Sequence, residues 1–218
     1  MWKKAAEILR GGGVVIIPSD SSYGIAALAS NPQSVERLYQ IKSREAGKPS
    51  LLIVGSMGQA RGLVEFTPLA EELAKKYWLA SLRGRSGPGG LTLVLNAKKL
   101  DLPEQIYGSG DTSDVSSQVM PGLHIGSERN VTLAVRLPDK KELQDLALEV
   151  GPFILPSANL AGEKPPFLAE EVDEKLKSQV DYFLDEPTDG SPPSTLVDVT
   201  GEKPYILRKG PVKVAEKS

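Results

Sequence analysis

The chain has 218 residues, of which 40% are hydrophobic and 25% are charged, and these values are typical of a soluble globular protein with one large domain. Its formal net charge of -2 provides no general basic field for nucleic acid, so such a contact would need a local patch. The absence of cysteine excludes disulfides, thiolate metal sites and a cysteine nucleophile. The N-terminus reads as a short amphipathic helix and not as a signal peptide, and no stretch approaches the roughly 20 apolar residues of a membrane span. We therefore expect a cytoplasmic protein that makes no membrane contact.

The first quarter of the chain predicts two helices and two buried strands. Residues 2–9 carry an apolar stripe with helical spacing, and the glycines at 11–13 end that helix. Residues 14–17 are consecutive apolar residues, as in strands that are covered on both faces. A second helix is predicted to begin at 31–32, where an asparagine N-cap precedes a proline at the first helical position. Residues 51–54 predict the next buried strand.

The rest of the chain continues this alternation of helices and strands. A helix is predicted to open at Thr67, another near 169–177, and a third from a capping-box pattern at Asp139 and Glu142 to Gly151. Further apolar strands are predicted at 91–95, 131–135, 153–155, 182–184, 195–199 and 205–207. Such alternation predicts an α/β fold with a mainly mixed sheet.

Two glycine-rich segments interrupt the pattern. Residues 81–90 contain four glycines and a proline, and residues 101–130 are polar with little periodicity. We interpret both as insertions into one domain that covers 1–212, with 213–218 as a tail.

Small polar and cationic side chains follow many of the predicted elements. The strand at 14–17 is stopped by Pro18 and followed by the row Ser19-Asp20-Ser21-Ser22, which is typical either of a ligand crevice or of an ordinary turn. Donors at other element ends are Lys42, Arg44, Lys48, Arg136, Ser157, Asn159, Ser194, Thr195 and Arg208. Together they suit a phosphate-bearing ligand, although any single one could simply face water.

Several standard catalytic sites are missing from the sequence. There is no Walker phosphate loop and no dinucleotide-binding glycine motif. His124 is the only histidine, and it lies in the irregular segment 101–130. No acidic pair has convincing spacing for a metal, so no metal ligand is predicted. The remaining chemistry is one in which cations and hydroxyls position reactants and neutralise charge.

Seven segments, in order and spanning nearly the whole chain, resemble the motifs of the YrdC-like family, the threonylcarbamoyl-AMP synthases. They are PSDSSYGI (18–25), KSR (42–44), GPGGLTLV (87–94), AVRLP (134–138), PSANLAG (156–162), STLVD (194–198) and LRKG (207–210). The resemblance implies the YrdC-like fold, a twisted mixed sheet flanked by helices with an open ligand crevice. It also implies the short form of the family, without a C-terminal extension.

The resemblance further implies a reaction and its partners. ATP, bicarbonate and L-threonine would give threonylcarbamoyl-adenylate and pyrophosphate, for modification of the adenosine beside the anticodon of certain tRNAs. Mg²⁺ would accompany ATP. Expected partners are the downstream tRNA threonylcarbamoyl-transfer machinery and, through a weak contact, tRNA itself.

By motif matching, the resemblance also assigns site residues. The ATP-binding positions are Lys42, Arg44, Lys48, Thr132, Ser157, Asn159 and Arg208. The threonine-binding positions are Ser19, Ser21, Arg136 and Ser194. The catalytic positions are Lys42, Arg44 and Arg136. Arg136 is the natural partner for the amino-acid carboxylate because its planar fork can hold both oxygens.

The sequence departs from the family pattern at several points, and alternatives stay open. Ser19 and Ser21 replace threonines, Ala161 replaces a frequent serine, and the segments 81–90 and 101–130 are longer than usual, so a lid there is a hypothesis. One alternative is a nucleotide- or RNA-binding module that has lost turnover. Another is a carbamoyl-transfer relative that acts on a different acceptor.

Overall fold

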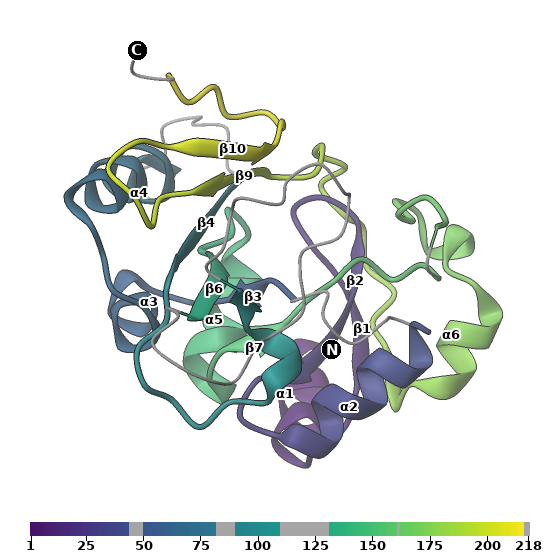
Figure 1. Ribbon diagram of the computed structural model, residues 1–218. Helices are drawn as coiled ribbons and strands as arrows, with labels where there is room; N and C mark the ends of the chain where they lie inside the picture. Colours follow the sequence, from purple (N-terminus) through teal and green to yellow (C-terminus); the bar gives the residue numbers. More distant parts are fainter. Residues whose placement is uncertain (44–49, 82–89, 110–130, 161, 216–218) are drawn as a thin grey trace.

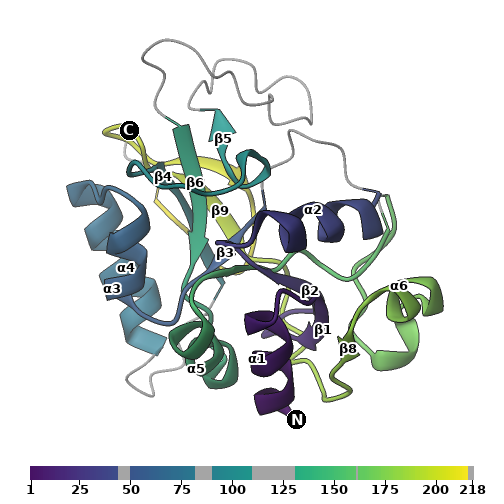
Figure 2. The same ribbon diagram turned by 90° about the horizontal axis from the view of Figure 1, so that it is seen from below.

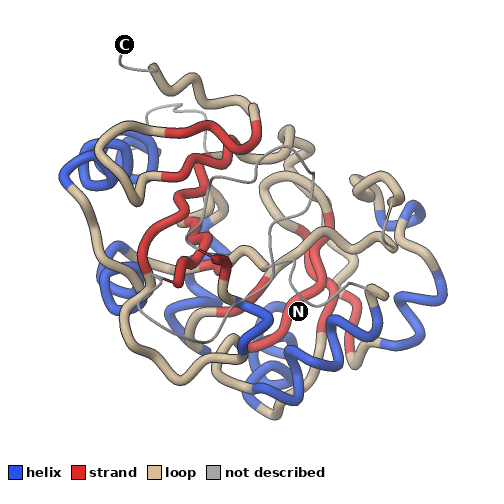
Figure 3. The backbone as a smooth tube through the Cα atoms, in the orientation of Figure 1, coloured by secondary structure: helices blue, strands red, loops and turns tan. Residues whose placement is uncertain are grey.

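A mixed sheet of ten strands organises the described part of the computed structural model, which comprises residues 1–43, 50–81, 90–109, 131–160 and 162–215. The strand order is β10-β9-β4-β6-β3-β7-β2-β1-β8, and β5 pairs with β6 beside this path (Figures 1 and 3). The strands are β1 (Val15–Pro18), β2 (Tyr23–Leu28), β3 (Leu52–Ile53), β4 (Leu91–Asn96), β5 (Gly108–Ser109), β6 (Val131–Arg136), β7 (Phe153–Ile154), β8 (Tyr182–Phe183), β9 (Thr195–Asp198) and β10 (Tyr205–Arg208).

Helices cover the sheet on both faces and enclose two apolar cores. The helices are α1 (Trp2–Arg10), α2 (Pro32–Ile41), α3 (Met57–Leu63), α4 (Pro68–Ser81), α5 (Lys141–Val150) and α6 (Glu174–Gln179). Helices α1 and α5 lie side by side on one face (Figure 2). Side chains of β1 alternate between the two cores, because Val15 and Ile17 pack with α1 and α5 while Ile16 packs with α2. The predicted α/β class, a twisted mixed sheet flanked by helices, is confirmed.

Most predicted elements are present, but strands β2 and β5 and helix α3 were not predicted, and β5 lies within the segment 101–130 that was interpreted as an insertion. Strand β2 has the sequence YGIAAL, whose glycine and alanines have weak strand propensity. It is a strand because it pairs antiparallel with β1 through the turn at 19–22 and is buried along its whole length. Helix α3 was also missed, although Ser56 caps it by accepting the Gln59 N–H. Strand β2 is thus fixed by its neighbours more than by local propensity, whereas α3 has a local N-cap signal.

Two predicted helix boundaries were wrong. The capping box at Asp139 and Glu142 does not form: α5 begins at Lys141, and its N-cap residue Lys140 makes no side-chain cap hydrogen bond. The Asp139 N–H instead donates to Asp20 Oδ2 at 3.3 Å, so the segment before the helix is tied to the turn after β1. The helix predicted near 169–177 divides into a 3₁₀ turn (Ala169–Glu171) and α6. None of the helices that the structure describes is long and apolar enough to cross a bilayer.

Asp181 ties together the start of β1, α2 and β8, and we expect its replacement to destabilise the fold. Its Oδ2 accepts the Val14 N–H at 2.7 Å and an Arg37 N–H at 2.5 Å. Asp181→Ala should lower the free energy of unfolding by about 1–3 kcal/mol, because the buried Val14 N–H loses its acceptor. The bond from Arg37, with the Val14 N–H, lowers the pKa of Asp181 despite its partial burial. This contribution should therefore be complete above the ordinary aspartate pKa and be lost as the pH falls through the lowered one.

Urea denaturation at pH 7 and near pH 3 measures both effects. Asp145→Ala is the matched control, because Asp145 forms an exposed ion pair with Lys141 one turn away on α5. Equal midpoints for the Asp181 and Asp145 variants at pH 7 would contradict the assignment.

Candidate functional site

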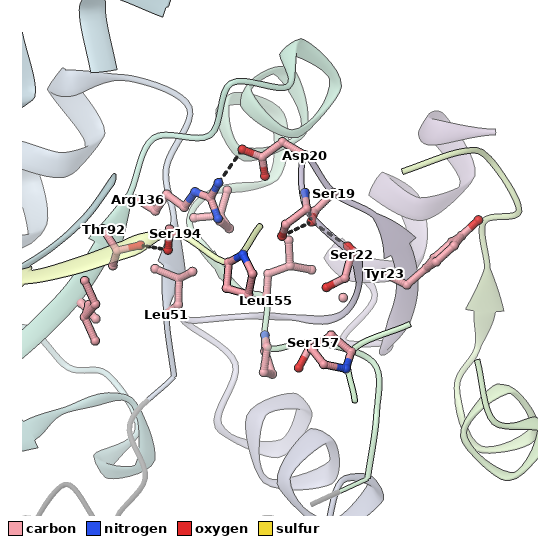
Figure 4. Close-up of a pocket in the computed structure, with 18 of the residues that line it drawn as sticks. Ser19, Asp20, Ser22, Tyr23, Leu51, Thr92, Arg136, Leu155, Ser157 and Ser194 are labelled. Carbon is pink, nitrogen blue, oxygen red and sulfur yellow. Dashed lines mark hydrogen bonds and ion pairs between the residues drawn. The ribbon is translucent and has the colours of Figure 1, made fainter. Parts of the chain in front are cut away.

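A pocket of about 290 Å³ opens where the turn after β1 meets β6, β9 and the segment after β7 (Figure 4). Its walls combine hydroxyls, two arginines, one carboxylate and an apolar floor. The polar lining residues are Ser19, Asp20, Ser21, Ser22, Thr92, Arg136, Ser157, Ser194 and Arg208. The floor includes Leu51, Ile53, Ala134, Leu155 and Leu196. The pocket is therefore suited to a small ligand with an anionic group and an apolar part.

The turn that joins β1 to β2 places a hydroxyl cluster on the pocket wall. Ser19 Oγ donates to the Ser22 carbonyl at 2.6 Å and accepts the Ser21 N–H at 3.1 Å. The hydroxyls of Ser19 and Ser21 lie 3.1 Å apart. Because the Ser19 proton is donated to the Ser22 carbonyl, Ser21 is the donor in the bond between the two hydroxyls, and a ligand that binds either hydroxyl has to replace that bond.

Ser194 connects the strands of the opposite wall. Its hydroxyl lies 2.7 Å from Thr92 Oγ1 and accepts an N–H from Arg208 at 3.0 Å. Arg208 Nε also donates to the Ser194 carbonyl, at 3.0 Å. Desolvation lowers the pKa of Arg208, and the nearby charge of Arg136 lowers it further. Arginine nevertheless stays protonated at neutral pH, so both guanidinium groups carry charge toward the same pocket.

Arg136 is the most buried cation of the pocket. It is 5% exposed, and its Nη2 donates to Asp20 Oδ2 at 2.5 Å. Its Nε is buried and has no hydrogen-bond partner in the part of the chain that the structure describes. Burial, followed by the charges of Asp20 and Asp189, raises the pKa of the adjacent Asp139. The Arg136 guanidinium thus combines one donor that Asp20 satisfies with one buried donor that no described residue satisfies.

Lys42 supports the edge of the pocket and does not line it. It is 4% exposed, and its ammonium donates to the carbonyls of Ser157 at 2.5 Å and Asn159 at 2.6 Å. The Ser157 strand bridge to Gly24 joins this turn to β2. The Asn159 amide donates to the carbonyls of Leu160 and Glu163, and its Oδ1 is a buried acceptor with no partner among the described residues. Lys42 therefore fixes the conformation of the turn that carries both side chains.

The structure gathers most, but not all, of the predicted site residues. Those that line the one pocket are Ser19, Ser21, Arg136, Ser157, Ser194 and Arg208. Thr132 is buried on β6, on the same face of the strand as Arg136 and four residues before it. It is not among the residues that line the pocket. Arg44, Lys48, Ala161 and His124 lie outside the described residues, as do most of the segments proposed as a lid.

Asp20 and Thr92 are pocket residues that the sequence did not single out as site residues. Asp20 stood in the hydroxyl row, but nothing in the sequence pairs it with a residue 116 positions away. Thr92 followed the glycine-rich segment as part of an apolar strand. Its position on β4 opposite Leu196 of β9, which also lines the pocket, is visible only in the sheet register.

Gly210 permits the close packing of the pocket wall, and we expect an added methyl group there to be costly. A Cβ at this position would overlap the backbone of Thr195, Ser194 and Pro193. Gly210→Ala should lower the free energy of unfolding by about 2 kcal/mol or more. Gly201→Ala is the control, because a Cβ there meets open space. Thermal unfolding of both variants measures the effect, and similar midpoints would contradict this packing.

Comparison with known proteins identifies the family and supports the fold. The family model Sua5/YciO/YrdC, described as "Telomere recombination", matches residues 7–210. A Mycobacterium tuberculosis relative is 32% identical over 95% of this chain and 83% of its own length. The "Threonylcarbamoyl-AMP synthase" of Bacillus subtilis is 31% identical over 95% of this chain and 52% of its own. The crystal structure of Pyrococcus abyssi Sua5 "complexed with L-threonine" superposes with a TM-score of 0.75 at 29% identity, over 96% of this chain and 54% of that one. The chain thus spans about half the length of these last two proteins.

Proposed function

This chain belongs to the Sua5/YciO/YrdC family, and from that premise we propose that it is a threonylcarbamoyl-AMP synthase. It joins L-threonine, bicarbonate and ATP into threonylcarbamoyl-adenylate and releases pyrophosphate. The product serves the threonylcarbamoyl modification of the adenosine beside the anticodon of tRNA. The observation that carries the proposal is one pocket in which arginines, hydroxyls and a small apolar floor converge.

The threonine end of the pocket is the wall between the turn after β1 and Ser194. Arg136 offers its unpartnered Nε to the carboxylate of the amino acid. The hydroxyls of Ser19 and Ser194 can bind the polar groups of threonine, and the apolar floor can pack against its methyl group. This division supports the assignment of Ser19, Ser21, Arg136 and Ser194 to threonine.

The nucleotide end is the turn at Ser157–Asn159 with its supporting Lys42. The unpartnered Oδ1 of Asn159 is an acceptor for a nucleotide N–H group. Arg44 and Lys48 follow Lys42 in the sequence and would meet the phosphates, with Arg208 at the mouth of the pocket. Thr132, which is buried on β6 and does not line the pocket, would support the nucleotide end from behind the pocket wall. Among the described residues no three His, Asp or Glu side chains are grouped to hold a metal ion, so Mg²⁺ would arrive on the ATP phosphates.

The reaction requires two anions to approach each other. Bicarbonate takes up a proton and loses water to give carbon dioxide, which the threonine amine captures as a carbamate with loss of a proton. A carbamate oxygen then attacks the α-phosphorus of ATP while the bond to pyrophosphate breaks. Arg136 and Arg208 lower the cost of that approach because their charges act in a partly desolvated pocket. Positioning and charge neutralisation suffice, so the pocket needs no histidine.

Mass spectrometry tests the proposal. ATP, bicarbonate and isotopically labelled L-threonine should give a labelled adenylate, with pyrophosphate release that requires both other substrates. Tight RNA binding without turnover would instead identify a binding module. Labelled product on an acceptor other than AMP would identify a carbamoyl-transfer relative. Within the proposal, the chain works in the cytoplasm, supplies a tRNA threonylcarbamoyl-transfer machinery and touches tRNA weakly.

A further inference from the structure

Asp20 is the one carboxylate among the described residues that line the pocket, and it is held in place from several sides. It is 5% exposed. Its Oδ2 accepts an N–H from Arg136 at 2.5 Å and the Asp139 N–H at 3.3 Å, and its carbonyl accepts the Ser191 N–H at 3.3 Å. A buried carboxylate with this many partners is costly to displace. A ligand therefore has to bind beside Asp20 and does not replace it.

Asp20 binds only one nitrogen of the Arg136 guanidinium group. The bond uses Nη2, whereas Nε is buried and unpartnered within the part of the chain that the structure describes. A buried donor without an acceptor is unfavourable, and a ligand oxygen would satisfy it. Figure 4 shows Asp20 on one side of Arg136 and Ser194 on the other, and the bond to Asp20 orients the guanidinium before a ligand arrives.

Asp20 also sets the charge of the pocket. The described lining residues carry two guanidinium groups, on Arg136 and Arg208, and one carboxylate, on Asp20. The pocket therefore carries one net positive charge, which a single ligand carboxylate neutralises. A phosphate dianion would leave an excess of negative charge beside the buried Asp20, and like charges in such a setting repel strongly.

We propose that Asp20 is a specificity-determining residue. It orients Arg136 by accepting a hydrogen bond from Nη2, and its negative charge keeps phosphate-type dianions out of the end of the pocket that binds the amino acid. The inference rests on the proposed function, because a pocket that handles ATP and releases pyrophosphate must keep both from its threonine end. Removal of the Asp20 charge raises the attraction for dianions. The threonine zwitterion has no net charge, so removal of the Asp20 charge does not strengthen its binding in the same way.

Isothermal titration of the full chain with inorganic phosphate and with L-threonine tests this. Asp20→Asn should bind phosphate about tenfold more tightly, a change of one decade in the dissociation constant, while threonine binding does not improve. Asp20→Glu keeps the charge and should keep the wild-type ratio of the two affinities. Asp189→Asn is the matched control, because Asp189 pairs with Lys140 at 2.8 Å on the exposed side and does not touch Arg136.

Each outcome decides the question. An unchanged affinity ratio in Asp20→Asn, equal tightening of both ligands, or the same shift in Asp189→Asn would overturn the proposal. Asp20→Ser, checked by thermal melting, carries the same test if the asparagine variant does not fold. If wild-type protein binds phosphate but not threonine, the proposed function fails, while the phosphate affinities of wild type and Asp20→Asn still decide the role of Asp20.

Discussion

Arg136→Ala is expected to weaken L-threonine binding by about a hundredfold while ATP affinity changes by less than about threefold. The side chain lines the end of the pocket that we propose for threonine, and its Nε is a buried donor that lacks a partner among the described residues. A carboxylate bound to a guanidinium makes a charge-assisted hydrogen bond, which is among the stronger polar contacts in proteins. Titration of each substrate separately measures the difference, and an equal loss of both affinities would refute the assignment.

The same substitution should also destabilise the fold, because it leaves Asp20 buried without its cation. Removing one partner of a buried ion pair costs about 3–5 kcal/mol. Arg136→Lys separates the two effects, since lysine keeps the charge beside Asp20 but has no planar fork. We expect that variant to melt closer to wild type and still to bind threonine poorly. A lysine variant with wild-type threonine affinity would show that charge alone matters.

Lys42→Met is expected to reduce turnover by about a hundredfold, with the loss in ATP affinity larger than the loss in threonine affinity. Methionine has a similar length but no donors, so it leaves the buried carbonyls of Ser157 and Asn159 without their ammonium. The turn that carries Ser157 and Asn159, which we propose to bind the nucleotide, would then lose its fixed conformation. Separate titrations with ATP and L-threonine, together with steady-state pyrophosphate release, measure these effects.

Lys98→Met is the matched control for this variant. Lys98 also donates its ammonium to a backbone carbonyl, that of Arg61, at 2.6 Å. That bond is exposed and is not part of the pocket, so turnover should stay at the wild-type level. An ATP affinity that is unchanged in Lys42→Met would contradict the role of Lys42 in shaping the turn.

The sequence predicted the elements that carry strong local signals. Asn31 and Pro32 predicted the start of α2 to the residue, and the apolar run at 14–17 predicted β1. Strand β2 escaped prediction because its alanines and glycine gain strand geometry only by pairing between β1 and β7. The capping box before α5 failed because the Asp139 N–H found an acceptor in a distant turn.

The site shows the same division between local and long-range information. Hydroxyls and cations at the ends of elements were sufficient to predict that Ser19, Ser157 and Arg136 line one pocket, since strand ends meet at one edge of a sheet. The Asp20 ion pair with Arg136 could not be predicted, because a carboxylate in a polar row carries no sign of its partner. The bonds from Lys42 to backbone carbonyls were equally hidden, since a lysine in a basic motif suggests an anion.

The parallel pairing of β9 with β4 and of β8 with β1 has a consequence for how the protein matures. The strands of each pair are separated in the sequence by about half the length of the chain or more. Contacts between such distant segments slow folding because long loops must close first. Ser194 and Arg208 follow β1 to β8 in the chain, so a nascent chain that stops before them has no complete pocket. A ligand of this pocket can therefore be bound only after β9 and β10 have joined the sheet, and by mass action its binding would stabilise that pairing.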